Sequence, residues 1–293
     1  MATRSSPIST SRPKPTILHA YARLVVLATA ALIAAGGLVT STGSGLSVPD
    51  WPLSYGGLNP PMVGGIRFEH THRLIAMAVG LLTIVLAVWL FRSEKRPWMK
   101  RLGAAAVGLV VLQGVLGGLT VIFLLPMPVS VLHACTGQIF FALVAAVAYF
   151  TSREWHLAPR IASYDAENLK LFARAFFGLL LFQLLLGAWT RHGGPAIMFH
   201  VFMGFVVLLA SGAIATRVAG ENATRPFLIH GVSLMLLAAL EVALGFLSFL
   251  VLRNAGEMAT PIQVYFPTLH QTFGAVLLAG GALLMLRFER ILE

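Results

Sequence analysis

Four histidines lie near the starts of apolar segments, in every second segment along the chain: His72, His133, His200 and His270. An ionisable side chain inside a membrane is costly and usually faces the interior of a helix bundle or a cavity. Imidazole is an axial ligand of heme iron, and two histidines from different helices can bind one iron from opposite sides. The sequence therefore predicts two pairs of axial ligands for two hemes. For any single histidine the alternative is a hydrogen-bonded interhelical residue or a pore-lining group.

The composition indicates the elements that must position these histidines. The chain has 293 residues, of which 57% are hydrophobic and 11% charged, and its mean hydropathy is +0.83. Eight apolar segments are long enough to cross about 30 Å of hydrocarbon. They cover residues 17–39, 74–92, 102–125, 128–150, 168–189, 195–217, 226–252 and 263–287. We expect an all-α polytopic membrane protein with eight transmembrane helices, arranged as two pseudo-symmetric four-helix bundles.

The distribution of basic residues predicts the orientation. The net charge is +10, but most Lys and Arg lie in the N-terminal tail, the even-numbered loops and the C-terminal tail. The odd-numbered loops and the adjoining helix ends offer only Arg67, Arg73, Arg191 and Arg253. This bias places both termini in the cytoplasm and the four histidines toward the outer face. It also argues against nucleic-acid binding. The Arg- and Ser-rich tail up to Pro15 is short for a transit peptide, which favours a bacterial cell membrane, and we expect the first apolar segment to be retained rather than cleaved.

An internal repeat divides the chain. Odd-numbered segments share a polar residue, a glycine four residues later and a hydroxyl three residues after that: Gln113, Gly117 and Thr120; Gln183, Gly187 and Thr190; Glu241, Gly245 and Ser248. The first segment keeps Gly37 and Thr40 but has Ile33 at the polar position. We therefore expect a cytoplasmic tail at residues 1–16, a first half at 17–155 and a second half at 156–293.

Three of the four histidines are followed by a glycine four residues later, at Gly137, Gly204 and Gly274. Such a glycine lies one turn along the same helix face. One interpretation is that the missing side chain lets a flat macrocycle approach the backbone. The alternative is close helix–helix packing, for which membrane proteins commonly use small residues. The roles of Gln113, Gln183 and Glu241 stay open between interhelical hydrogen bonding and chemistry.

The two halves differ beside their first histidines. Glu69 lies three residues before His72, whereas Ile197 lies three residues before His200. A carboxylate at that spacing would project beside the same iron site, where it could hold or transfer a proton. The apolar second half suits a retained redox cofactor better. These residues therefore assign the reacting substrate to the first half.

The first outer loop, from Thr40 to Thr71, is much the longest and is rich in Gly, Ser and Pro at residues 42–52. A solvated connector is the plain interpretation, but long loops in compact domains are often lids or binding elements. The apolar side chains of Trp51, Leu46 and Val48 in this loop favour a lid.

The five remaining histidines are expected at surfaces or helix ends: His19, His70, His156, His192 and His230.

The loop motif at residues 42–52, the group Glu69, His72 and Arg73, and the later histidines over eight segments resemble heme A synthase. The resemblance implies that His200 and His270 ligate a heme b cofactor, while His72 and His133 flank the heme O substrate. It also implies oxidation of a porphyrin methyl group to a formyl group, with Glu69 as the catalytic carboxylate and Arg73 contacting the substrate or steadying the site.

The resemblance further implies partners: a farnesyltransferase that makes heme O, and oxidase assembly factors. Many bacterial members carry cysteine pairs in the outer loops, whereas this chain has only Cys135. Small-residue helix faces also permit self-association without requiring it.

Two other functions fit the same pattern. A two-heme electron-transfer cytochrome would also use paired histidines in a helix bundle. A transporter would also show an internal repeat, but these segments lack obvious breaks at mid-span.

Overall fold

A computed structural model describes residues 17–220, 225–253 and 259–293, and the predicted tail at residues 1–16 lies outside them. Every regular element within these ranges is a helix. Eight helices are long and apolar enough to cross a membrane. They are α1 (Ile17–Ser41), α2 (Ile66–Ser93), α3 (Pro97–Ile122), α4 (Met127–Phe150), α6 (Ala166–Arg191), α7 (Ile197–Gly220), α8 (Arg225–Leu252) and α9 (Pro261–Ile291), with a short α5 (Arg153–Leu157) between α4 and α6.

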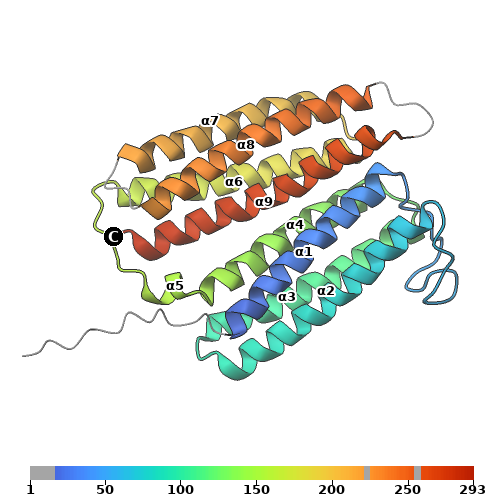
Figure 1. Cartoon of the computed structure of the whole chain (residues 1–293), viewed down its shortest axis with the longest axis horizontal. Coiled ribbons are helices and arrows are strands. Elements are labelled where there is room, and N and C mark those ends of the chain that lie inside the picture. Colours follow the sequence, from blue (N-terminus) through green and yellow to red (C-terminus); the bar gives the residue numbers. More distant parts are fainter. Residues whose placement is uncertain (1–16, 221–224, 254–258) are drawn as a thin grey trace, which may run out of the picture.

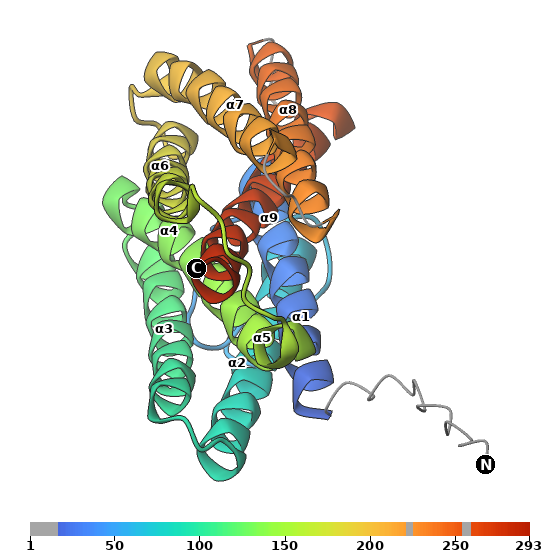
Figure 2. The same ribbon diagram turned by 90° about the vertical axis from the view of Figure 1, so that its left-hand side faces the viewer.

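The long helices form two groups of four (Figure 1). Helices α1 to α4 pack in sequence and α4 returns to α1, while α6 to α9 pack in sequence and α9 returns to α6. The two groups meet through α1, α4, α6 and α9, and the view in Figure 2 shows α9 near the middle of the molecule. The predicted boundary at residue 155 falls within α5, which links the groups.

Helix α4 contributes a long run of buried residues to the core: every residue from Phe140 to Phe150 except Leu143 is buried. A helix that is apolar on all sides is stable only when other helices surround it, and α4 contacts α1, α3, α6 and α9. One hydrophobic cluster lies mainly within α6 to α9, around Phe176 and Phe288. A second cluster joins α1 to α4 and includes Ala275 and Ala279 of α9. The two groups therefore share packed apolar surface.

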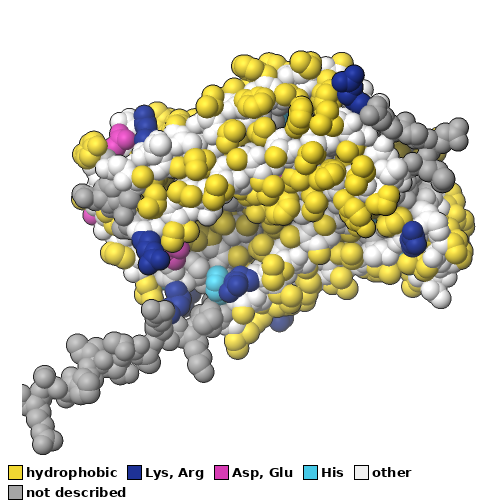
Figure 3. All heavy atoms as spheres, turned by 45° about the horizontal axis from the view of Figure 1, so that its top comes forward, with side chains coloured by type: hydrophobic (Ala, Val, Ile, Leu, Met, Phe, Trp, Pro, Cys, Tyr) yellow, Lys and Arg dark blue, Asp and Glu magenta, His cyan; other side chains and the backbone are white. Residues whose placement is uncertain are grey.

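The outer surface suits lipid. Large hydrophobic side chains are exposed along most of the long helices, and Figure 3 shows them across the midsection, with most charged side chains in view toward the two ends. Because such a surface would be unstable in water, the chain is a multi-pass membrane protein. The start of α1 and the end of α9 lie at the same end of the molecule (Figure 1).

The prediction of eight membrane segments is confirmed, and the largest difference in bounds is at the start of α2. Helix α2 begins at Ile66 rather than at residue 74, so Glu69, His72 and Arg73 lie on its first turns. Hydropathy marks only the part of a helix that lies in hydrocarbon, and these polar turns extend beyond it. The first outer loop is therefore shorter than expected and covers residues 42–65.

Candidate functional site

Each of the four predicted histidines lies against a glycine of the preceding long helix. The pairs are His72 with Gly36, His133 with Gly117, His200 with Gly187 and His270 with Gly245. A Cβ atom added at these glycines would lie 3.0, 3.3, 2.9 and 3.0 Å, respectively, from the imidazole Cε1. The distance at Gly187 is shorter than real Cβ atoms show, and the other three are tighter than most real Cβ contacts, so the imidazoles lie in space that glycine leaves free.

In α1 this glycine is Gly36, not the Gly37 that aligns with the other repeats. Gly37 instead faces α9, where an added Cβ would lie 3.1 Å from Cγ2 of Thr268. Neighbouring helix positions point about 100° apart, so a register shift of one residue changes the contacted helix. The first repeat therefore differs from the other three by one residue at this contact.

The glycines that follow the histidines also differ from expectation. A Cβ at Gly137 would lie 3.3 Å from Oε1 of Gln113, and a Cβ at Gly274 would lie 3.2 Å from Oε2 of Glu241. Gly204 similarly faces Nε2 of Gln183, at 3.5 Å. These glycines make room for the polar side chain of the neighbouring helix. These contacts favour the alternative interpretation, close helix–helix packing.

His200 and His270 form a close pair. The ring centroids of His200 and His270 lie 6.0 Å apart, with their planes at 72°. Two imidazoles that bind one metal from opposite sides, at about 2 Å from each nitrogen, have ring centres about 6 Å apart. His72 and His133 lie at the corresponding positions of the first four helices, each against a glycine of the preceding long helix. The close pair has the donor set of a two-ligand metal centre.

The inner nitrogens of these imidazoles are enclosed by protein. Nδ1 of His72, His133 and His200 is buried without a hydrogen-bond partner among the described residues. An unpaired buried polar atom costs free energy and often marks a functional site. Nδ1 of His270 is likewise without a hydrogen bond of suitable geometry, although it lies 2.9 Å from Oε2 of Glu241. Because Nδ1 of each ring is enclosed by protein, Nε2 is the ring nitrogen that is suited to bind a metal.

Glu69 is buried, with 4% of its surface exposed. Its Oε2 accepts a hydrogen bond from the backbone N–H of Val48 at 2.8 Å. Its Oε1 pairs with Nη2 of Arg73 at 2.5 Å. The predicted carboxylate therefore lies one turn before His72 and connects α2 to the first outer loop.

Arg73 fastens that loop to α2. Its Nη1 donates to the backbone carbonyls of Asp50 and Leu53, at 2.7 and 2.8 Å, and its Nη2 donates to that of Val48 at 3.2 Å. The planar guanidinium has five donors in a fixed geometry, which suits several carbonyls at once. Of the two predicted roles of Arg73, these contacts favour the one that steadies the site.

A tight turn shapes the tip of the loop. The carboxylate of Asp50 accepts hydrogen bonds from the backbone N–H groups of Tyr55 and Gly56, both at 2.7 Å. Tyr55 and Gly56 have φ values of 54° and 71°, which glycine adopts without strain. The N–H of Gly56 is the main cause that lowers the pKa of Asp50, and Arg73 adds to it. Asp50 therefore stays ionised while it holds the turn.

His70 is also part of this assembly, against the expectation of a surface position. It is buried, with 5% exposure, and its Nδ1 lies 2.9 Å from Oγ of Ser54 in the loop. Because α2 starts earlier than hydropathy indicated, His70 faces the folded loop rather than solvent. It is a second connection between helix and loop.

The loop reaches α3 through Trp51. A Cβ at Gly118 would lie 2.6 Å from Cδ2 of the Trp51 indole, so the ring lies directly on the backbone of α3. The preceding residue, Gly117, faces His133. The loop therefore extends from the turn of α2 that carries His72 to the end of α3 beside His133, as expected for a lid over the first pair.

Arg191 is a functional candidate that the sequence analysis did not single out. It ends α6 one turn after Gly187, and its Nη2 donates to Oγ of Ser41 on α1 at 2.6 Å. Thr268 of α9 donates to the same hydroxyl at 3.0 Å. The contacts join the two helix groups near the histidine end. The feature of the sequence that could have drawn attention to Arg191 is its position as an arginine at the end of an apolar segment.

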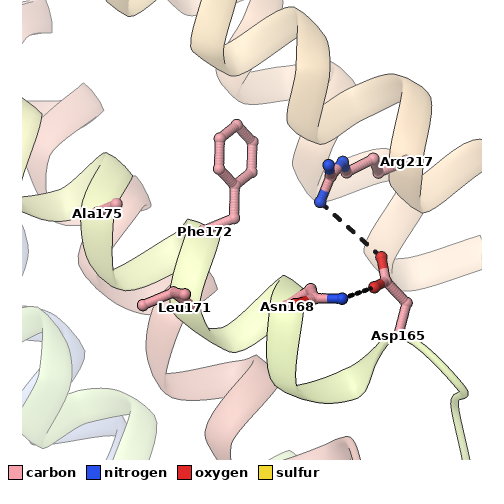
Figure 4. A pocket seen from close by; sticks show the side chains of 6 residues that line it. All are labelled: Asp165, Asn168, Leu171, Phe172, Ala175 and Arg217. Atoms are coloured by element: carbon pink, nitrogen blue, oxygen red, sulfur yellow. Dashed lines mark hydrogen bonds and ion pairs between the residues drawn. The ribbon is translucent and has the colours of Figure 1, made fainter.

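A separate pocket lies between the start of α6 and the end of α7 (Figure 4). Its lining includes Asp165, Phe172 and Arg217. Arg217 pairs with Asp165 at 3.9 Å and lies over the ring of Phe172. Arg217 is 17 residues from His200 on the same helix, which corresponds to about 25 Å, so this pocket lies far from the histidines.

Comparison with known proteins finds a family that is similar to part of this arrangement. Residues 66–202 match the family model COX15-CtaA, described as cytochrome oxidase assembly protein. The matched range includes Glu69, Arg73 and three of the four histidines, and it ends before His270.

Curated relatives with the name heme A synthase are also similar to this chain. The protein of Alkalihalophilus pseudofirmus is 32% identical over 182 residues, which cover 60% of each chain. That of Shouchella clausii is 32% identical over 173 residues, covering 54% of this chain and 53% of the relative. That of Shewanella oneidensis is 28% identical over 195 residues, covering 60% and 57%. The chain thus matches somewhat more than half of the length of these family members.

Proposed function

We propose that the protein is a heme A synthase, which oxidises a methyl group of heme O to a formyl group. The observation that carries this proposal is the asymmetry of two similar histidine pairs. The first pair has a buried carboxylate, Glu69, one turn from its ligand His72, while the second pair has Ile197 at that position. The relatives named heme A synthase support the same activity.

In this proposal His200 and His270 hold a heme b cofactor. The 6.0 Å separation of their ring centroids, the enclosed inner nitrogen of His200 and the glycine beneath each ring all fit axial ligation. When bound, such a heme supplies one-electron redox chemistry. The two residues orient it, and the apolar helices around it keep water away.

The first half holds the substrate, heme O, between His72 and His133. Two successive hydroxylations of one methyl group, each of which needs an oxygen atom and an external two-electron oxidant, followed by loss of water would give the formyl group. Glu69 would accept or deliver a proton, or stabilise positive charge that develops on the reacting carbon. Arg73 holds the carboxylate in place through their pair at 2.5 Å and keeps the loop closed over the site, which limits the access of water.

The same proposal covers topology and symmetry. The four matching contacts between histidine and glycine support two pseudo-symmetric four-helix bundles, at residues 17–155 and 156–293. The excess of Lys and Arg in the even-numbered loops supports cytoplasmic termini. The histidine pairs and the loop at residues 42–65 then lie toward the outer face.

Heme extraction from cells that supply heme O tests the activity. Wild-type protein should yield heme A and retain heme b, whereas Glu69→Gln should retain heme b and yield no heme A. Undiminished heme A from Glu69→Gln would reject the role of Glu69. Two heme b molecules per wild-type chain, without heme O or heme A, would instead indicate an electron-transfer cytochrome.

A comparison of Arg73→Ala with Glu69→Gln distinguishes a chemical role of Glu69 from a role in closing the loop. Both variants break the pair between Glu69 and Arg73, but only Glu69→Gln removes the carboxylate. If Glu69 acts on the substrate, Arg73→Ala should keep measurable heme A formation while Glu69→Gln loses it. Equal losses in the two variants would indicate that Glu69 only anchors the loop.

A further inference from the structure

We propose that Glu241 is a positioning residue for His270 and that it lowers the redox potential of the iron that His270 binds. Oε2 of Glu241 on α8 lies 2.9 Å from Nδ1 of His270 on α9. Glu241 is buried, with 8% of its surface exposed. This inference rests on the proposed function, because the iron is that of the heme assigned to His200 and His270.

Two glycines hold the pair together. A Cβ at Gly274 would lie 3.2 Å from Oε2 of Glu241, and a Cβ at Gly245 would lie 3.0 Å from Cε1 of His270. The carboxylate and the ring therefore have little room to move apart. Each helix supplies one polar side chain and one glycine to the contact, which fixes the two side chains relative to each other.

The equivalent polar residues of the other repeats bond elsewhere. Gln113 donates its Nε2 to the hydroxyl of Thr136, and Gln183 donates its Nε2 to the backbone carbonyl of His200 at 3.0 Å. An amide can both donate and accept, whereas an ionised carboxylate only accepts. Among the described residues, His270 alone of the four histidines faces an acidic side chain.

This difference determines how His270 binds a metal. A carboxylate oxygen 2.9 Å from Nδ1 favours the tautomer with its proton on Nδ1, which leaves Nε2 unprotonated in the form that binds a metal. The same contact makes the imidazole more basic, and negative charge near an iron stabilises its oxidised state. Burial strengthens both effects, since little water screens the carboxylate. The iron of the second half should therefore have a lower potential than it would with glutamine at position 241.

Glu241→Gln is the test variant, because the chain already carries glutamine at the two equivalent positions and the side chain keeps its size. The purified full chain is measured for heme content, for hemin affinity and for the midpoint potential of its b-type heme. We expect the midpoint potential to rise and hemin affinity to fall roughly 10-fold to 100-fold. Glu241→Asp, which keeps the charge at a longer distance, should give intermediate values.

Ser211→Ala is the matched control. Ser211 is fully buried in the same half, and its hydroxyl donates only to the carbonyl of Leu208 in its own helix. This control should keep the wild-type potential and affinity. If Glu241→Gln loses heme while Ser211→Ala keeps it, and the helix content of both is unchanged, that loss would also support the proposal, as would a rise in the midpoint potential.

Two failures are distinguishable. If the wild-type protein binds heme and Glu241→Gln has the same potential and affinity, Glu241 has no such role, and the proposal is overturned. If neither the wild-type protein nor Ser211→Ala binds heme, the proposed function itself fails, and with it the premise of this inference.

Discussion

The imidazole of His200 on α7 lies over Gly187 on α6, so closely that a Cβ at Gly187 would lie 2.9 Å from Cε1 of the ring. The ring is also enclosed around Nδ1, which is buried. The position of this predicted ligand therefore depends on a residue that has no side chain. The same relationship recurs at His72, His133 and His270.

We expect Gly187→Ala to displace His200 and reduce the b-type heme that purifies with the protein. Forcing an extra methyl group into a packed contact typically costs about 1–3 kcal/mol, and here the displaced group is the proposed ligand. Heme per chain is measured by pigment extraction. Gly178→Ala on the same helix is the control, because nothing lies within 4 Å of its added Cβ. Equal heme content in both variants would contradict the prediction.

Trp51 gives a second prediction, specific for the first half. A Cβ at Gly118 would lie 2.6 Å from Cδ2 of the indole, so Gly118→Ala should lift Trp51 from α3. We expect heme A formation to fall while b-type heme is retained. Gly114→Ala, on the same helix with open space at its Cβ, should keep both. A loss of b-type heme in Gly118→Ala would show that the change is not confined to the first half.

Much of this arrangement could be predicted from the sequence, because hydrophobic length and repeat spacing are local properties. Eight apolar segments gave the eight membrane helices, and the spacing of His200 and His270 gave a pair whose rings lie 6.0 Å apart. The repeat also placed Glu241 at the position that faces α9. These features depend on helix periodicity, which the sequence displays directly.

The other features of the arrangement depend on contacts between helices and loops, which the periodicity of the sequence does not indicate. Gly36 rather than Gly37 meets His72 because the rotation of α1 is set by packing against both α2 and α9. The loop is fastened by Arg73 through backbone carbonyls, whose positions no residue type reveals. Similarly, hydropathy could not show that the polar residues around Glu69 continue α2 beyond the membrane.

The Arg73 contacts predict how the loop opens. Arg73→Ala should remove three bonds to loop carbonyls and leave Glu69 buried without its partner. Breaking a buried ion pair on one side costs roughly 3–5 kcal/mol, so amide hydrogen exchange across residues 42–65 should become much faster. Exchange in α6 to α9 should not change. Arg67→Ala, which removes an exposed arginine of the same helix, is the control, and faster loop exchange there would contradict the assignment to Arg73.

Asp50 predicts the pH dependence of the same loop. Its pKa is lowered from 3.8, mainly by the N–H of Gly56 and further by that of Tyr55 and by the charge of Arg73. A group whose pKa is lower in the folded state stabilises that state above its unfolded pKa, which is about 3.9 for Asp. The stabilisation is lost as the pH falls through the lowered pKa.

We therefore expect the amides of Tyr55 and Gly56 to keep constant protection between pH 8 and about pH 5, after correction for intrinsic exchange, and to lose it below about pH 4. Asp50→Asn should protect these amides less, because a neutral oxygen is the weaker acceptor, and should show no such pH step. Exchange measured on the purified protein over this range checks both. A loss of protection between pH 7 and pH 6, or a step below about pH 4 that persists in Asp50→Asn, would assign the transition to another group.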